Sequence, residues 1–237
     1  MDIGYNEGAM GLANDLIPLG VMSDTLFEIQ IKDIVADIAR FNGDLGREGL
    51  RVAYVRSIPP KLPHPPYRGS EWVIWKSPPK LRLKVNFDGA VFRENDTAGV
   101  GAMIQDDKGL MVIVMADMVP LPYSVTTMEV PAAIKALRFA SDIGLASFIL
   151  EGDSKITIDA LLGDNMEHVE FGNLIEEAKW LSSQFVDVSY SHVRRQGNCA
   201  AHNTARHARH VSEYTVWIEV VPLHLSAVIL DDLVSFE

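Results

Sequence analysis

Residues 81–88 constrain the fold more than any other segment, because apolar and polar side chains alternate along them without interruption. The apolar positions are Leu81, Leu83, Val85 and Phe87, and the polar positions are Arg82, Lys84, Asn86 and Asp88. This period of two predicts a strand with one buried face. Two further strands are predicted over residues 98–105 and 110–118, joined by a turn at residues 106–109. Strands with such short connections pair in the antiparallel direction.

The pattern becomes helical after residue 118, and helices then alternate with strands. Helices are predicted over residues 126–141, 154–162 and 171–181 and after a cap at Asn198, with strands over residues 147–151 and 185–193. Helical crossovers connect parallel strands of one sheet. The order therefore predicts an α/β fold, in which a mixed five-stranded sheet has three antiparallel strands, then parallel ones, and is flanked by helices.

The remaining segments differ from this region in composition. Residues 58–79 are rich in proline, which favours an extended linker over a helix or a sheet. Residues 1–57 form an N-terminal extension that is predicted to be partly helical, because apolar residues from Phe27 to Ile38 fall on one helical face. Residues 80–212 then form the predicted domain, and residues 213–237 form a C-terminal tail.

The composition indicates an intracellular protein with a sizeable core. Hydrophobic residues make up 48% of the 237 residues, yet no apolar run is long enough to cross a bilayer. The N-terminus lacks the features of a signal peptide, and the single Cys199 is better read as a small buried helix residue than as a catalytic thiol. We expect a monomer in the nucleus or cytoplasm, with no membrane partner.

The charge distribution limits the kinds of partner. A net charge of −11 argues against strong non-specific binding to nucleic acid, which depends on Lys and Arg. The basic residues are concentrated, however: residues 51–84 contain Glu71 as their one acid, and residues 194–210 contain none. Local charge of this kind permits a nucleic-acid-binding face. Solvated surface charge explains the first segment equally well.

Three acids fall where the predicted fold would bring them together. Asp88 lies at the end of the first strand, Glu129 at the start of the first helix and Asp153 at the end of the fourth strand. A helical face of small residues follows Glu129, at Ala132, Ala133, Ala136 and Ala140. Such a face lets the helix lie close to the sheet. Converging carboxylates are the ligands that Mg²⁺ prefers, and two such ions can activate water and stabilise a leaving oxygen. Helix caps and surface charges are the alternative reading.

Four sequence motifs resemble the type 1 ribonuclease H family, in the order expected for that family. They are VNFDGA at 85–90, MEVPAAIKAL at 128–137, LEGDS at 150–154 and HVRRQGN at 192–198, followed by AAH at 200–202. The last motif, together with WKSPP at 75–79, is similar to the plant reverse-transcriptase-like branch, whose members often descend from retroelements. The resemblance covers about residues 72–237 and implies a ribonuclease-H-like fold.

The resemblance also implies a function and a set of site residues. It makes Asp88, Glu129 and Asp153 the metal ligands of an endonuclease that uses Mg²⁺ or Mn²⁺ to hydrolyse the RNA strand of RNA–DNA hybrids. Further residues, near the site or in the basic segment, are expected to contact the substrate: Ser124, Thr126, Arg194, Arg195 and Asn198. Helix capping explains Thr126 and Thr127 equally well.

Departures from the family pattern point to weak activity. The fourth carboxylate of the family falls on His202, a poor ligand for Mg²⁺, and no acid lies between Asp187 and Glu213 to replace it. The stretch 163–170, where cellular members often carry a basic loop, is acidic. Two alternatives therefore stay open. One is a non-catalytic nucleic-acid-binding remnant of a retroelement, and the other is a protein-interaction module that recruits a partner through the N-terminal helix or the apolar tail.

Overall fold

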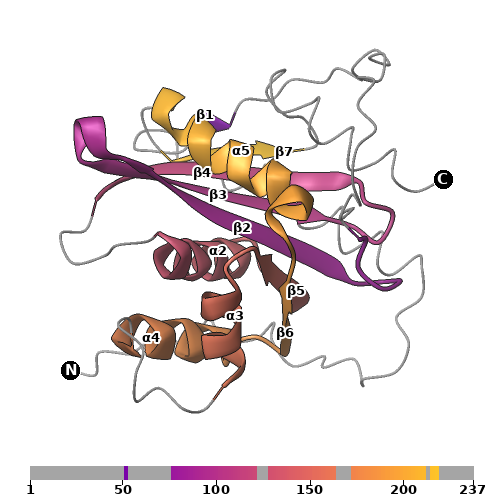
Figure 1. Cartoon of the computed structure of the whole chain (residues 1–237). Coiled ribbons are helices and arrows are strands. Elements are labelled where there is room, and N and C mark those ends of the chain that lie inside the picture. The colour runs from indigo at the N-terminus through magenta and orange to yellow at the C-terminus, as the bar shows by residue number, and fades with distance from the viewer. Residues whose placement is uncertain (1–50, 53–75, 122–127, 164–171, 212–213, 219–237) are drawn as a thin grey trace, which may run out of the picture.

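The computed structural model describes residues 51–52, 76–121, 128–163, 172–211 and 214–218. A single mixed sheet, ordered β1-β7-β4-β3-β2-β5-β6, runs through the described part of the chain (Figure 1). Its strands are β1 (Arg51–Val52), β2 (Leu83–Phe92), β3 (Thr97–Gln105), β4 (Met111–Pro120), β5 (Ser147–Gly152), β6 (Asp187–His192) and β7 (Thr215–Ile218). The predicted N-terminal helix and most of the Pro-rich linker and C-terminal tail lie outside the described residues.

Helices cover both faces of the sheet. They are α2 (Glu129–Asp142), α3 (Lys155–Leu162), α4 (Gly172–Ser182) and α5 (Cys199–His207), with short 3-10 turns at η1 (Arg93–Asn95), η2 (Arg195–Asn198) and η3 (Ala208–His210). Figure 1 shows α5 on one side of the sheet and α2, α3 and α4 on the other. No helix among the described residues combines the length and the apolar character needed to span a membrane.

The strand directions confirm the predicted mixed sheet. β2 pairs with β3, and β3 with β4, in the antiparallel direction, whereas β2 with β5 and β5 with β6 are parallel. The sheet is wider than the five strands expected. β7 adds to β4 in the antiparallel direction, and the two-residue β1 pairs with β7. All four residues of β7 are buried, so this short segment lacks the alternation by which a half-exposed strand is recognised.

The main core lies between the sheet and α2. Val85, Phe87 and Leu150 of the sheet are fully buried there. The alanine face of α2 is also buried completely, with Ala132, Ala133, Ala136 and Ala140 at 0% exposure. Because these side chains are small, the helix axis can approach the strands closely, as the sequence pattern predicted.

The polar face of β2 is buried as well, which corrects the expectation of a strand with only one buried face. Lys84, Asn86 and Asp88 are 5%, 2% and 1% exposed. β2 lies in the interior of the sheet and α5 packs over this face, so the polar side chains are covered by protein. Alternation along the sequence predicts which side chains share a face, but not whether another element covers it.

Two glycines of β3 let α5 pack directly on the sheet. A Cβ atom at Gly101 would lie 2.3 Å from the backbone nitrogen of Ala205 and 2.6 Å from the carbonyl oxygen of Ala201. A Cβ atom at Gly99 would lie 2.1 Å from the carbonyl oxygen of Ala205. Helix backbone therefore occupies the space where side chains would stand, and this contact sets the position of α5.

We predict that Gly101→Ala destabilises the protein by about 2 kcal/mol, because the new methyl group must push α5 away from β3. The measurement is the free energy of unfolding from urea titration followed by circular dichroism. Gly172→Ala is the matched control, since a Cβ atom there meets nothing within 4 Å. It should leave stability unchanged or raise it slightly. Equal unfolding free energies for the two variants would contradict this account of the α5 contact.

Candidate functional site

Three carboxylates from three different elements meet at one end of the parallel strand pair. Asp88 lies within β2, Glu129 is the first residue of α2, and Asp153 follows the last residue of β5. The parallel register pairs Asn86 with Glu151, so Asp88 and Asp153, each two residues further on, lie level with one another. One carboxylate oxygen from each of the three acids lies within 4.8 Å of the others.

Gly89 makes room for the start of α2. A Cβ atom at this position would lie 2.4 Å from the Cβ atom of Met128 and 2.7 Å from its carbonyl oxygen. The residue before α2 therefore packs against the β2 backbone next to Asp88. This contact, together with the alanine face further along the helix, brings the Glu129 carboxylate to the strand-borne aspartates.

The crowding of these acids changes their proton affinity. Burial, and then the nearby charges of Asp88 and Asp153, raise the pKa of Glu129 to about 8. Burial and the charge of Asp88 also raise the pKa of Asp153, while the positive charges of Arg195 and His202 oppose that rise. The Glu129 Oε2 atom is buried and has no hydrogen-bond partner among the described residues.

This donor set fits a divalent cation. All three groups offer oxygen ligands, which hard cations such as Mg²⁺ and Mn²⁺ accept. A bound cation would also satisfy the orphaned Glu129 oxygen and offset the repulsion between the acids. Within the described ranges, these three residues form the one group of acidic, His or Cys side chains arranged closely enough to hold an ion.

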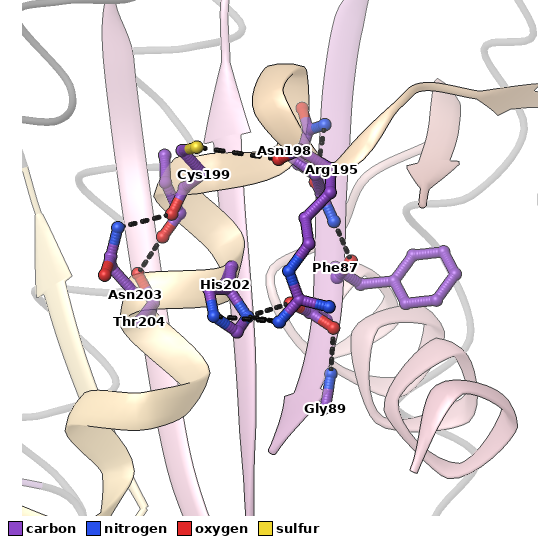
Figure 2. A network of polar contacts seen from close by, with 11 residues as sticks. Phe87, Gly89, Arg195, Asn198, Cys199, His202, Asn203 and Thr204 are labelled. Carbon is purple, nitrogen blue, oxygen red and sulfur yellow. Dashed lines mark hydrogen bonds and ion pairs between the residues drawn. The ribbon is translucent and has the colours of Figure 1, made fainter. Parts of the chain in front are cut away.

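His202 lies beside this cluster and contacts it through Asp88. Its Nδ1 atom is 2.7 Å from Asp88 Oδ2, while Asp88 Oδ1 accepts the backbone N–H of Gly89 at 2.7 Å. The Nη2 atom of Arg195 lies 3.1 Å from His202 Nδ1 and 3.0 Å from Nε2. Figure 2 shows the Arg195 side chain reaching from the turn before α5 to the His202 ring. His202 therefore faces a carboxylate of the cluster and does not belong to the group of converging ligand atoms.

Asn198 does not cap α5 with its side chain, contrary to the sequence expectation. It is 1% exposed, and its amide nitrogen donates to the backbone carbonyl of Phe87 at 2.9 Å. Its Oδ1 atom accepts from Asn86 Nδ2 at 3.2 Å. The polar atoms that would cap the helix are used to attach the turn before α5 to β2, next to Asp88.

A buried polar network beneath the site was missed by the sequence reasoning. Glu151 accepts hydrogen bonds from Lys84 at 3.0 Å, Asn86 at 3.0 Å and Ser191 at 2.8 Å. It thereby links β2, β5 and β6 on the face that α5 partly covers. The sequence does show that Lys84, Asn86 and Asp88 share one face of a strand, which could have indicated the network. The sequence analysis instead treated that face as exposed to solvent.

Arg194 and Arg195 are exposed at the turn before α5, and Arg195 contacts His202 beside the carboxylate cluster. Cys199 is half-buried rather than buried, at the start of α5. The predicted substrate contacts Ser124 and Thr126, and nearly all of the acidic stretch 163–170, lie outside the described residues.

Residues 86–208 match the family described as reverse transcriptase-like, and the chain belongs to this family. The matched segment contains all three carboxylates, His202 and Arg195. Its fold is ribonuclease-H-like, as the sequence resemblance implied.

Several solved structures are similar to the chain, whereas no curated protein matches it. RNase H1 from Halobacterium salinarum is 28% identical, with a TM-score of 0.48, and the match covers 54% of this chain and 98% of that one. An N-terminal RNase H domain from Mycobacterium tuberculosis is 23% identical, with a TM-score of 0.46 and coverage of 54% and 92%. LC11-RNase H1, solved in complex with an RNA/DNA hybrid, is 18% identical, with a TM-score of 0.46 and coverage of 54% and 96%.

We predict that the metal-free protein loses stability as the pH rises from 4.5 towards 8, and that Glu129→Gln removes much of this loss. Between these values the unfolded chain releases the Glu129 proton while the folded chain keeps it. The contribution is at most about 1.4 kcal/mol for each pH unit. Unfolding free energies at pH 5.5 and 8 in the presence of a chelator provide the measurement.

The exposed Glu176→Gln is the control for this prediction, because it removes an acid from α4 rather than from the cluster. Its pH dependence should follow that of the wild type. Parallel curves for the wild type and Glu129→Gln would show that Glu129 is not the group that retains a proton.

Proposed function

We propose that the protein is a metal-dependent endonuclease that cuts the RNA strand of RNA–DNA hybrids. The observation that carries this proposal is the convergence of Asp88, Glu129 and Asp153 within 4.8 Å, with a buried Glu129 oxygen that lacks a partner. The family to which the chain belongs, and the order of its four motifs, support the same function. The last motif further supports the plant, retroelement-derived branch as its origin.

The side chains have separate tasks in this proposal. The three carboxylates would hold Mg²⁺ or Mn²⁺, which activates water and stabilises the oxygen that leaves phosphorus. Gly89 and His202 orient Asp88 by binding one of its oxygens each. The exposed Arg195 presents a permanent positive charge at the rim, where a phosphodiester backbone would approach. Selection of the RNA strand would rest on contacts with its 2′-hydroxyl groups.

A second candidate is a nucleic-acid-binding protein that does not cut. The observation that favours it is that Asp88 is already engaged by His202, with Arg195 beside them. The fourth family carboxylate is also missing at position 202. A basic group that blocks the metal ligands would leave binding intact and abolish cleavage.

We predict that Asp88→Asn reduces Mg²⁺-dependent cleavage of a labelled hybrid at least a hundredfold while the protein stays folded. The amide keeps the shape of the side chain but lacks the negative charge that binds the cation. Without the cation, the reaction loses its main electrostatic stabilisation. The control is Asp96→Asn, the same chemical change at an exposed residue. Its left-handed φ of 49° is one that asparagine tolerates.

Cleavage rate and hybrid affinity are both measured for each protein. Together, the two measurements distinguish the endonuclease from the non-catalytic binding protein. Wild-type cleavage that Asp88→Asn abolishes and Asp96→Asn retains supports the endonuclease. Hybrid binding without cleavage by the wild type, in either Mg²⁺ or Mn²⁺, supports the non-catalytic candidate. Undiminished cleavage by Asp88→Asn would mean that the activity comes from another site.

We also predict that His202→Asp raises Mg²⁺-supported cleavage roughly tenfold, because a fourth carboxylate adds an oxygen ligand where the family has one. The wild type should cleave better with Mn²⁺ than with Mg²⁺, and the variant should narrow that difference. The exchange removes the contact with Asp88 and adds a fourth negative charge, so the metal-free variant should be less stable than the wild type, and its folding is checked by circular dichroism. Equal and negligible rates for both proteins with both metals would reject the weakened-enzyme hypothesis.

A further inference from the structure

A cation supplied by the protein itself lies beside the carboxylate cluster. Arg195, the first residue of η2, extends its guanidinium to the ring of His202, which in turn contacts Asp88 (Figure 2). The same guanidinium is close enough to act electrostatically on both Glu129 and Asp153. Arg195 therefore acts electrostatically on two acids of the cluster and is linked to the third, Asp88, through His202.

His202 links Arg195 to Asp88. Its Nδ1 atom lies 2.7 Å from Asp88 Oδ2. Arg195 Nη2 lies at nearly equal distances from the two ring nitrogens, 3.1 and 3.0 Å, so the guanidinium contacts the ring as a whole. Asp88, His202 and Arg195 thus form a connected chain. An aspartate at position 202, as the family pattern has it, would instead add a negative charge.

We propose that Arg195, held by His202, takes the place of a second metal ion, so that the carboxylate site accepts a single divalent cation. This inference rests on the metal site of the proposed function. With a cation bound and Glu129 ionised, the three carboxylates carry three negative charges, of which Arg195 offsets one and a single divalent ion offsets the remaining two. A second divalent ion would leave the cluster with an excess of positive charge.

The contacts of Asp88 also disfavour a second ion. Both of its oxygens already accept a hydrogen bond, Oδ1 from Gly89 and Oδ2 from His202. Each carboxylate oxygen keeps a second lone pair, but a cation held at Oδ2 would lie beside the His202 ring and the Arg195 guanidinium. Repulsion between the guanidinium and such an ion disfavours a second ion, because Arg stays charged at all accessible pH values.

The number of bound ions tests the proposal without depending on cleavage. Mn²⁺ is titrated into the full-length protein, and bound and unbound ions are distinguished by electron paramagnetic resonance. The wild type should bind one Mn²⁺ per chain at this site. His202→Asp, which removes the holder of Arg195 and adds a carboxylate, should bind two.

Arg195→Gln tests the role of the guanidinium directly. Removing the competing cation should tighten binding of the first Mn²⁺ roughly tenfold, as expected for a unit charge a few ångströms from the ion in a partly screened site. Arg206→Gln on the exposed side of α5 changes the net charge equally and should leave the affinity within about twofold, because exposed charges are screened by salt. Circular dichroism and thermal unfolding confirm that each variant is folded.

Two results would overturn the proposal. One is binding of two Mn²⁺ ions by the wild type with similar affinity. The other is equal Mn²⁺ affinity for Arg195→Gln and Arg206→Gln. The proposed endonuclease activity is tested independently. Binding of one Mn²⁺ without any hybrid cleavage would reject that activity and still support the single-ion site.

Discussion

Repulsion among three carboxylates, one buried and two half-buried, is the interaction around which this structure is arranged. Asp88, Glu129 and Asp153 place their oxygens within 4.8 Å, and burial and mutual charge keep the pKa of Glu129 near 8. Such an arrangement lowers the stability of the folded chain unless protons or cations neutralise it. It persists because well-packed elements force each acid into place, which is typical of sites where function opposes stability.

The packing that maintains this cluster comes from small residues. Gly89 admits the start of α2 to the β2 backbone, and Gly101 admits the backbone of α5 to β3. The alanine face of α2 supports the same close approach on the other side of the sheet. Neighbouring atoms fill the space where a side chain would stand at the two glycines, and only methyl groups fit at the alanines, so these positions leave little room for adjustment. The carboxylates are thus brought together by steric fit elsewhere and not by any attraction between them.

The buried polar network connects this scaffold to the cationic side of the site. Glu151 accepts hydrogen bonds from Lys84, Asn86 and Ser191. Asn86 also donates a hydrogen bond to Asn198. Arg195 lies three residues before Asn198 and His202 four residues after it. Fixing that one asparagine against β2 therefore sets where both basic side chains emerge. A network of this kind is costly to disturb, since any lost partner would leave a buried polar group unsatisfied.

The sequence by itself determined the order of strands and helices, the three acids and their meeting at one end of the sheet. Local periodicity, short turns and the handedness of crossovers are encoded within neighbouring residues, and they suffice for that much. Only the tertiary structure decided that the polar face of β2 is buried, that β7 extends the sheet, and that Asn198 binds β2 instead of capping α5. It also decided that Arg195 reaches the site. These features depend on which element covers a given face of the sheet. The covering element is determined by contacts between residues far apart in the chain, such as Asn86 and Asn198. Local sequence patterns contain no information about such contacts.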